Sequence, residues 1–165
     1  MLALRQFLIR VSQTYQELHV SELFDEKGFY PVFTKDLKRC KRELVIESPF
    51  ITNRRLSTIL PELESLSEKR VSILINTRDP IEIEDEYQRS EAYRAVSRLQ
   101  HIGIRVLYTK GLHRKTAIID ESILYEGSLN ILSQNNSTEI MRRIKSKVLV
   151  SQLVHFIGID RFYDR

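Results

Sequence analysis

The sequence has a single cysteine and no long apolar run. Cys40 has no second cysteine with which to form a disulfide or a cysteine-based zinc site. A lone thiol suits a reducing compartment, so we expect a cytoplasmic protein in which Cys40 packs against a sheet from the apolar side of a helix. No stretch approaches the roughly 18 uninterrupted apolar residues of a membrane-spanning helix, which argues against an integral membrane protein.

The sequence also lacks internal repeats and low-complexity segments. Its 42% hydrophobic and 29% charged residues are those of an ordinary soluble domain that can bury a core. A length of 165 residues corresponds to one domain. The formal net charge of +4 and the isoelectric point near 9.2 favour a polyanionic partner.

The first 28 residues predict an N-terminal amphipathic helix. Two arginines interrupt the apolar run, and no small-residue cleavage site follows it, so a signal peptide is disfavoured. We expect this extension, residues 1–28, to pack at a dimer interface or against a partner, with contact to a membrane surface as the alternative. Apolar residues recur along it at helical spacing: Leu4, Leu8, Val11 and Tyr15.

Strands alternate with helices along the remaining residues 29–165, which predicts a single α/β domain. We expect a mixed, mostly parallel sheet with helices on both faces. The expected helices begin after Thr34, after Thr52 or Asn53, and near Glu86. Strands are expected at residues 44–50, 71–77 and 104–110, followed by a hairpin and a last helix.

The most informative segment begins at His113 and continues, after one residue, with Lys115. Side chains two apart lie on one face of a strand, so both should point the same way. Asp120 is an odd number of residues from His113 and Lys115, so its side chain should point to the other face of the strand, and it precedes turn-forming residues. We therefore expect it to support the backbone or to contact the residues that surround the site. In the returning strand, Gly127 permits close backbone approach.

Ser128 and Asn130 share one face of that returning strand, so the hairpin should carry a polar patch. Fixed spacings join all these positions: His-x-Lys, four residues, Asp, six residues, Gly-Ser-x-Asn. This pattern resembles the signature of the phospholipase D superfamily without a gap. The likeness extends over roughly residues 29–160, and the segment 135–144 resembles the family's following strand, whose acid falls at Glu139.

The resemblance implies a phospholipase D-like fold and a homodimeric active site. Members with one motif per chain, such as small bacterial endonucleases and cardiolipin hydrolase-like nucleases, assemble the site from two copies across a twofold axis. The family implies a covalent phosphohistidine on His113 of one copy and a general acid on His113 of the other. Lys115, Asn130 and Ser128 would hold the phosphoryl oxygens, while Glu139 would orient the imidazole.

Two lysines in such a site would do the electrostatic work of a divalent metal, so neither metal nor cofactor is expected. The other histidines have no partners at metal-ligand spacing and are expected to be structural: His19, His101 and His155. We therefore expect a metal-independent phosphodiesterase that cleaves DNA, with RNA as an alternative substrate.

Basic residues near the motif supply candidate phosphate contacts. The candidates are Arg78, Arg114, Arg142, Arg143 and Lys145. No aromatic residue is interleaved with the basic segment 141–147, so this segment gives little sign of base stacking. Two other functions stay open: a phospholipid phosphodiesterase, which needs an apolar groove beside His113, and a non-catalytic nucleic-acid-binding domain.

Overall fold

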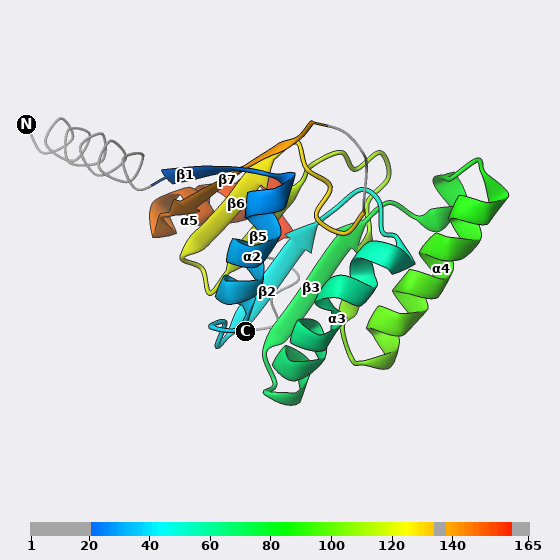
Figure 1. Ribbon diagram of the computed structural model, residues 1–165, viewed down its shortest axis with the longest axis horizontal. Coiled ribbons are helices and arrows are strands. Elements are labelled where there is room, and N and C mark those ends of the chain that lie inside the picture. Colours follow the sequence, from blue (N-terminus) through cyan, green and yellow to red (C-terminus); the bar gives the residue numbers. More distant parts are fainter. Residues whose placement is uncertain (1–20, 134–137, 160–165) are drawn as a thin grey trace, which may run out of the picture.

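The computed structural model describes residues 21–133 and 138–159. The predicted helix of the N-terminal extension and His19 lie outside these residues. Seven strands form one sheet (Figure 1). Their spatial order is β1 (Ser21–Asp25), β7 (Ile140–Lys145), β6 (Ile123–Gly127), β5 (Thr116–Ile119), β2 (Glu43–Glu47), β3 (Ser72–Thr77) and β4 (Arg105–Tyr108).

The predicted mixed sheet is confirmed, but its parallel majority is wrong. Only the β2–β3 and β3–β4 pairs are parallel, whereas the other four pairs are antiparallel. A parallel pair needs a long crossover connection, usually a helix. Among strands that are neighbours in the described sheet, helical connections run only from β2 to β3 and from β3 to β4, while β5 and β6 are joined by a tight turn.

Helices cover both faces of the sheet, as predicted (Figure 1). Along β2, Leu44 and Ile46 belong to one apolar cluster and Val45 to the other, which is the alternation expected of a central strand. Three helices pack on the first face and one on the second: α2 (Glu26–Leu37), α3 (Asn53–Glu68) and α4 (Glu86–His101), then α5 (Lys147–Ile157).

The first helix begins earlier than the sequence suggested. Asp25 caps α2 by accepting a hydrogen bond from the Gly28 amide at 2.8 Å, and Thr34 lies inside the helix instead of capping one. Phe29 and Phe33 are fully buried at helical spacing, which explains why the helix covers this segment. The predicted boundary after residue 28 therefore falls within α2, and residues 21–28 belong to the sheet and this helix.

The strand directions bring several loops to one edge of the sheet. Parallel β2 and β3 both end there, and β5 begins there because it runs antiparallel to β2, with Thr116 opposite Glu47. β6 ends and β7 begins at the same edge, where Gly127 lies opposite Met141. Residues far apart in the sequence can therefore meet in one place at this edge.

Candidate active site

A pocket of about 860 Å³ opens at this edge of the sheet. The loops that follow β2 and β6 and the segments that precede β5 and β7 form its walls. It brings together seven of the predicted site residues: His113, Arg114, Lys115, Ser128, Asn130, Glu139 and Arg142. The motif residues other than Asp120 therefore lie around one pocket, while their roles in catalysis stay predictions.

His113 and Lys115 are in direct contact. The Lys115 ammonium donates to the His113 carbonyl at 2.7 Å and lies 3.0 Å from Nδ1 and 3.3 Å from Nε2 of the ring. The two residues precede β5, which begins at Thr116, and the contact between their side chains shows that both lie on one side of the chain. The lysine is 9% exposed and the histidine is exposed, so a cation stands behind an accessible imidazole.

The electrostatic environment of Lys115 is balanced between opposing effects. Burial lowers the pKa of its ammonium, the nearby Glu139 carboxylate raises it, and the Arg78 guanidinium lowers it, with a net downward shift. Glu139 therefore favours the charged lysine. The sequence assigned Glu139 to the orientation of His113, whereas the effect found in the structure is on Lys115.

The backbone around Gly127 and Ser128 is held against β7. A Cβ atom added at Gly127 would lie 2.2 Å from the Ile140 carbonyl oxygen, so only glycine permits this approach. The Ser128 amide donates to the same carbonyl at 3.0 Å, and the Ser128 hydroxyl accepts from the Ile140 amide at 3.1 Å. Ser128 thus fixes the start of β7 and keeps its hydroxyl proton available for donation into the pocket.

Asn130 lies at the base of the pocket with 8% of its surface exposed. Its amide oxygen is buried and has no hydrogen-bond partner within residues 21–133 and 138–159. Leaving such a group unsatisfied costs about 1–3 kcal/mol. The unpaired atom is an acceptor, so only a hydrogen-bond donor would satisfy it, whereas the NH2 of the same side chain is the group that can donate to a phosphoryl oxygen.

The sequence analysis missed Glu47, which lies at the end of β2 and is fully buried. Its carboxylate accepts two hydrogen bonds from Arg114, at 2.7 and 2.8 Å, and further ones from Asn76 at 2.9 Å and Thr116 at 3.3 Å. The hydrogen bond to Glu47 raises the pKa of Arg114. An acidic residue closing an otherwise apolar strand was the signal that could have identified it.

Arg114 therefore differs from its predicted role as a contact to nucleic acid. Its guanidinium is committed to Glu47, although its side chain is still 39% exposed and lines the pocket. Because Arg114 stands between His113 and Lys115, this ion pair anchors the segment that carries both. Arg114 is better described as a positioning residue.

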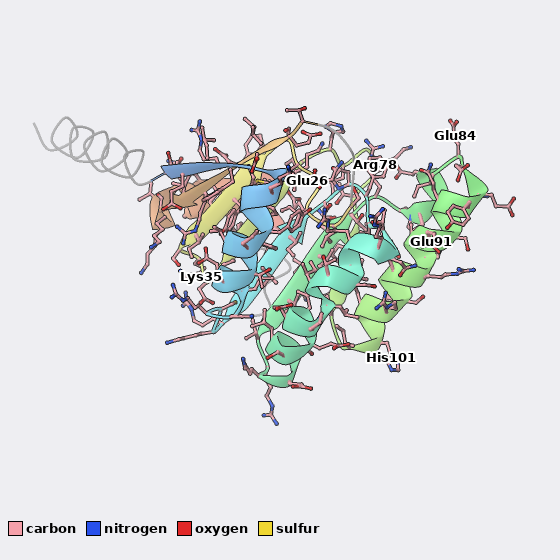
Figure 2. The ribbon with its side chains drawn as sticks, in the orientation of Figure 1. Glu26, Lys35, Arg78, Glu84, Glu91 and His101 are labelled. Carbon is pink, nitrogen blue, oxygen red and sulfur yellow. The ribbon has the colours of Figure 1, made fainter. Side chains whose placement is uncertain are left out.

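Arg78 anchors the same segment from the loop after β3. Its Nε donates to the Leu112 carbonyl at 2.7 Å, and its guanidinium lies 5.2 Å from the centre of the Phe50 ring. Arg78 lies at the end of β3 near the start of α3, where it is labelled in Figure 2. The predicted cation thus lies beside the pocket, close enough to influence Lys115.

Neighbouring basic residues of β7 point to opposite faces of the sheet because side chains alternate along a strand. Arg142 lines the pocket, as predicted. Arg143 points into the core, where it is 5% exposed and pairs with Asp36 at 2.6 Å, so its predicted contact with nucleic acid is wrong. Lys145 is exposed but stands about 17 Å along β7 from Ile140, at the end away from the pocket.

Asp120 does not belong to the pocket. It follows β5, at the opposite end from His113, and its carboxylate accepts hydrogen bonds from the backbone amides of Lys41, Arg42 and Glu43, the shortest at 2.8 Å. The expected support of the backbone is what the structure shows, and Asp120, although part of the motif, does not line the pocket with the other motif residues. Asp120 ties the turn after β5 to the start of β2.

Other predicted features lie away from the site. Cys40 is buried in the loop after α2, not on a helix, and burial chiefly raises its pKa to about 12. Within the part of the chain that the structure describes, no three His, Cys, Asp or Glu side chains are grouped to hold a metal. No helix among the described residues is long and apolar enough to cross a membrane.

Comparison with known families agrees with this site and fold. Residues 33–157 match the family model described as the cardiolipin synthase, PLD-like domain. Since the match covers most of the chain, the protein belongs to this family of the phospholipase D superfamily. No curated protein sequence matches the chain significantly.

Solved structures with the same fold include NucT and Nuc, each of which is matched over most of its own length. NucT from Helicobacter pylori superposes with a TM-score of 0.67 at 17% identity, over 82% of this chain and 91% of that one. Nuc from Salmonella typhimurium, a phospholipase D family member, gives 0.65 at 15% identity, over 82% and 90%. Polyphosphate kinase from Porphyromonas gingivalis gives 0.66 at 15% identity, over 87% of this chain and 26% of that one. The phospholipase D-like fold is therefore confirmed.

Proposed function

We propose that the protein is a metal-independent phosphodiesterase that cleaves nucleic acid, with DNA as the favoured substrate. The observation that supports this most directly is the contact between Lys115 and His113 in a pocket that also holds Ser128, Asn130 and Glu139. A phosphodiester needs a nucleophile, positive charge for its non-bridging oxygens and a proton for the leaving oxygen. These residues supply the first two.

The third requirement is met by a second copy of the chain. Among the described residues, the pocket contains one histidine, His113. Large apolar side chains are exposed at its rim, with Leu23 61%, Ile140 56% and Phe50 37% exposed. Such a surface favours a protein contact. A twofold axis through this face would bring two copies of His113 together in an isologous dimer.

The proposed reaction has two displacements at phosphorus. In the first, one imidazole attacks, the bond to the leaving oxygen breaks, and His113 of the second copy gives that oxygen its proton. In the second, the now neutral imidazole takes a proton from water, whose oxygen attacks phosphorus and breaks the bond to nitrogen. The enzyme returns to its starting state. Lys115 of both copies and the side chains of Ser128 and Asn130 hold the non-bridging oxygens throughout.

Charge favours nucleic acid as the substrate. The chain carries a net charge of +4, and Arg142 lines the pocket while Arg78 lies beside it. Phosphate contacts from such side chains give affinity without sequence preference. Nuc, whose structure is described as that of a phospholipase D family member, shares the fold. The expected location is the cytoplasm.

A phospholipid phosphodiesterase is the second candidate, and a specific observation favours it. The exposed rim formed by Leu23, Phe50 and Ile140 is an apolar surface beside His113, which a lipid substrate would require. The same three side chains cannot both contact acyl chains and lie within a dimer interface. The two candidates therefore make different demands on one surface.

Purified protein assayed on plasmid, single-stranded DNA, RNA and cardiolipin vesicles, with and without chelator, tests the proposal. We expect cleavage of nucleic acid that survives chelation, is suppressed by salt, and is lost in both His113→Ala and Lys115→Ala. Cleavage confined to cardiolipin would replace the nuclease with the lipid enzyme. Binding of DNA without cleavage under any condition would leave a non-catalytic domain.

A further inference from the structure

A second groove, of about 640 Å³, lies between α3 and α4, outside the active site. Asn53 contributes from the start of α3, while α4 contributes three arginines and a partly exposed tyrosine. These α4 residues are Arg89, Arg94, Arg98 and Tyr93. None of them takes part in the proposed reaction, so the groove requires an explanation of its own.

The groove carries net positive charge. Arg98 donates to the Asn53 side-chain oxygen at 3.3 Å and to Ser57 at 3.0 Å, and Arg89 donates to the Ile83 carbonyl at 3.3 Å. These acceptors are neutral, so they orient the two guanidinium groups without cancelling their charge. Each guanidinium has five donors, which leaves several for an anion.

The remaining charges of the groove do not reverse this balance. Arg94 forms an ion pair with Glu91 at 3.3 Å. The Glu91 carboxylate also accepts a hydrogen bond from the side-chain amide of Asn53 at 3.0 Å. Glu91 is labelled on α4 in Figure 2. Glu86 is the acidic residue in the lining of the groove. Within the lining, Arg89 and Arg98 therefore exceed the one carboxylate of Glu86, while the acidic residues Glu84 and Asp85 lie just before α4 and outside the lining.

The groove also offers aromatic surface. Tyr93 is 44% exposed and forms part of the lining, between Arg89 and Arg94 in the sequence. Tyr108, at the end of β4, is likewise 44% exposed. Exposed rings beside arginines form the platform on which unpaired bases stack. A duplex, whose bases are already stacked on each other, cannot use such a platform.

The groove begins next to the active site. Phe50 lines the active-site pocket and Asn53 lines the groove, and three residues of chain span at most about 11 Å. The Arg78 guanidinium lies over the ring of Phe50, which lines the active-site pocket. In Figure 1, α3 begins near the end of β2, and α4 begins at the same end of the molecule but farther from β2. A strand leaving His113 can therefore enter the groove directly.

We propose that the groove between α3 and α4 binds single-stranded nucleic acid that extends from the active site. Arg89 and Arg98 contact its phosphates, and Tyr93 stacks on one base. This inference rests on the proposed function, because it takes the strand in the groove to be the flank of the cleaved substrate. It assigns the protein a preference for unpaired substrate that the catalytic residues alone do not give.

Binding of a fluorescein-labelled single strand to the His113→Ala protein, followed by anisotropy over a range of salt concentrations, tests the proposal. The variant Arg89→Gln/Arg98→Gln removes the two charges while keeping helix-forming residues. Its matched control is Lys35→Gln/Arg39→Gln, which removes two exposed charges at and beyond the far end of α2. Figure 2 labels Lys35 there, away from the groove.

We expect the groove variant to weaken binding and to reduce the slope of log affinity against log salt by about 1.4, or about 0.7 per lost contact with a single strand. The control should behave as the parent protein. Tyr93→Ala should weaken binding about tenfold, and Tyr93→Leu, which preserves apolar packing, should do the same. Equal binding by the groove and control variants overturns the proposal, as does an equal loss of affinity for duplex DNA.

Hydrolysis of bis(p-nitrophenyl) phosphate separates this inference from the proposed function. This small diester fits the His113 pocket alone, so Arg89→Gln/Arg98→Gln should hydrolyse it at the unmodified rate while losing kcat/KM on a long single strand. If the unmodified protein hydrolyses neither substrate, the proposed function fails. The anisotropy measurement still decides whether the groove binds nucleic acid.

Discussion

Arg114 presents one edge of its guanidinium to both oxygens of Glu47, with Nε 2.7 Å from Oε2 and Nη2 2.8 Å from Oε1. Glu47 is fully buried, whereas Arg114 is partly exposed. This fork-to-fork contact fixes the orientation of the residue between His113 and Lys115. His113 and Lys115, the proposed nucleophile and its cation, are thus held through a neighbour that need not touch the substrate.

We expect Arg114→Met to destabilise the fold by about 2–4 kcal/mol, because it leaves the buried Glu47 carboxylate without its cation. Glu47→Gln should cost less, since the amide is neutral and Arg114 can reach water. Urea unfolding followed by circular dichroism measures both. Arg39→Met, which changes an exposed arginine, should alter the free energy of unfolding by no more than about 0.5 kcal/mol.

The opposite order, with Glu47→Gln more damaging than Arg114→Met, would show that Glu47 has a role other than pairing with Arg114. A loss of activity in Arg114→Lys without loss of stability would support the positioning role. Lysine keeps the charge but cannot make the two parallel hydrogen bonds.

Local pattern was sufficient to predict much of the architecture. The fixed spacing from His113 to Asn130 identified the site, and Thr52 was a correct helix cap whose side chain accepts from the Arg55 amide at 3.3 Å. The helix predicted from about Glu86 was also found, and the expected strand at 71–77 is present with its observed start at Ser72. These features depend on neighbours in sequence, which a single chain reveals.

Features that depend on distant pairing could not be predicted in the same way. The burial of Arg143 against Asp36 requires α2 to lie over β7, and the sequence gives no sign of that contact. The antiparallel majority of the sheet likewise depends on which strands become neighbours. Strand β1 was missed because Ser21–Asp25 is a short segment at the edge of the sheet.

Asp120→Asn should reduce stability at neutral pH by about 1–2 kcal/mol, through weaker hydrogen bonds to backbone amides. Burial raises the pKa of Asp120, but hydrogen bonds from the amides of Arg42, Glu43 and Lys41 outweigh burial and lower it. A lowered pKa means that the stabilisation is complete above the unfolded value and is lost as the pH falls through the folded value.

The difference in unfolding free energy between the parent protein and Asp120→Asn should therefore be largest near pH 7 and shrink below about pH 4. Denaturant unfolding at several pH values measures it. Glu121→Gln is the control, because the neighbouring Glu121 carboxylate is exposed. Its ion pair with Arg42 is long, at 3.9 Å, and therefore contributes little to stability. A difference that grows on acidification would contradict the assigned direction.

Glu139→Gln should move the alkaline limb of the kcat/KM profile to lower pH. The Glu139 carboxylate raises the pKa of Lys115 against burial, which lowers it, so its removal lets the ammonium lose its proton earlier. Glu126→Gln is the matched control because it neutralises another carboxylate of the pocket. An alkaline limb that stays in place in Glu139→Gln would remove the proposed link to Lys115.

The proposed two-copy site requires a dimer for activity. Equilibrium sedimentation should show a dimer at micromolar concentration, and activity per chain should fall when dilution separates the copies. Leu23→Asp would place a charge on the exposed rim and should weaken both the dimer and the activity. A monomer with full activity would exclude the two-copy mechanism.

Mixed dimers provide the sharpest measure of that mechanism. A dimer of one unmodified chain and one His113→Ala chain keeps a single imidazole, which can act as nucleophile or as acid but not as both. Its turnover should fall far below half of the unmodified rate, as measured after purification through two different affinity tags. A mixed dimer with Lys35→Gln, an exposed change far from the pocket, should keep the full rate. Retention of half the rate by the His113→Ala mixed dimer would mean that each copy works alone, because independent sites lose activity only in proportion to the number removed.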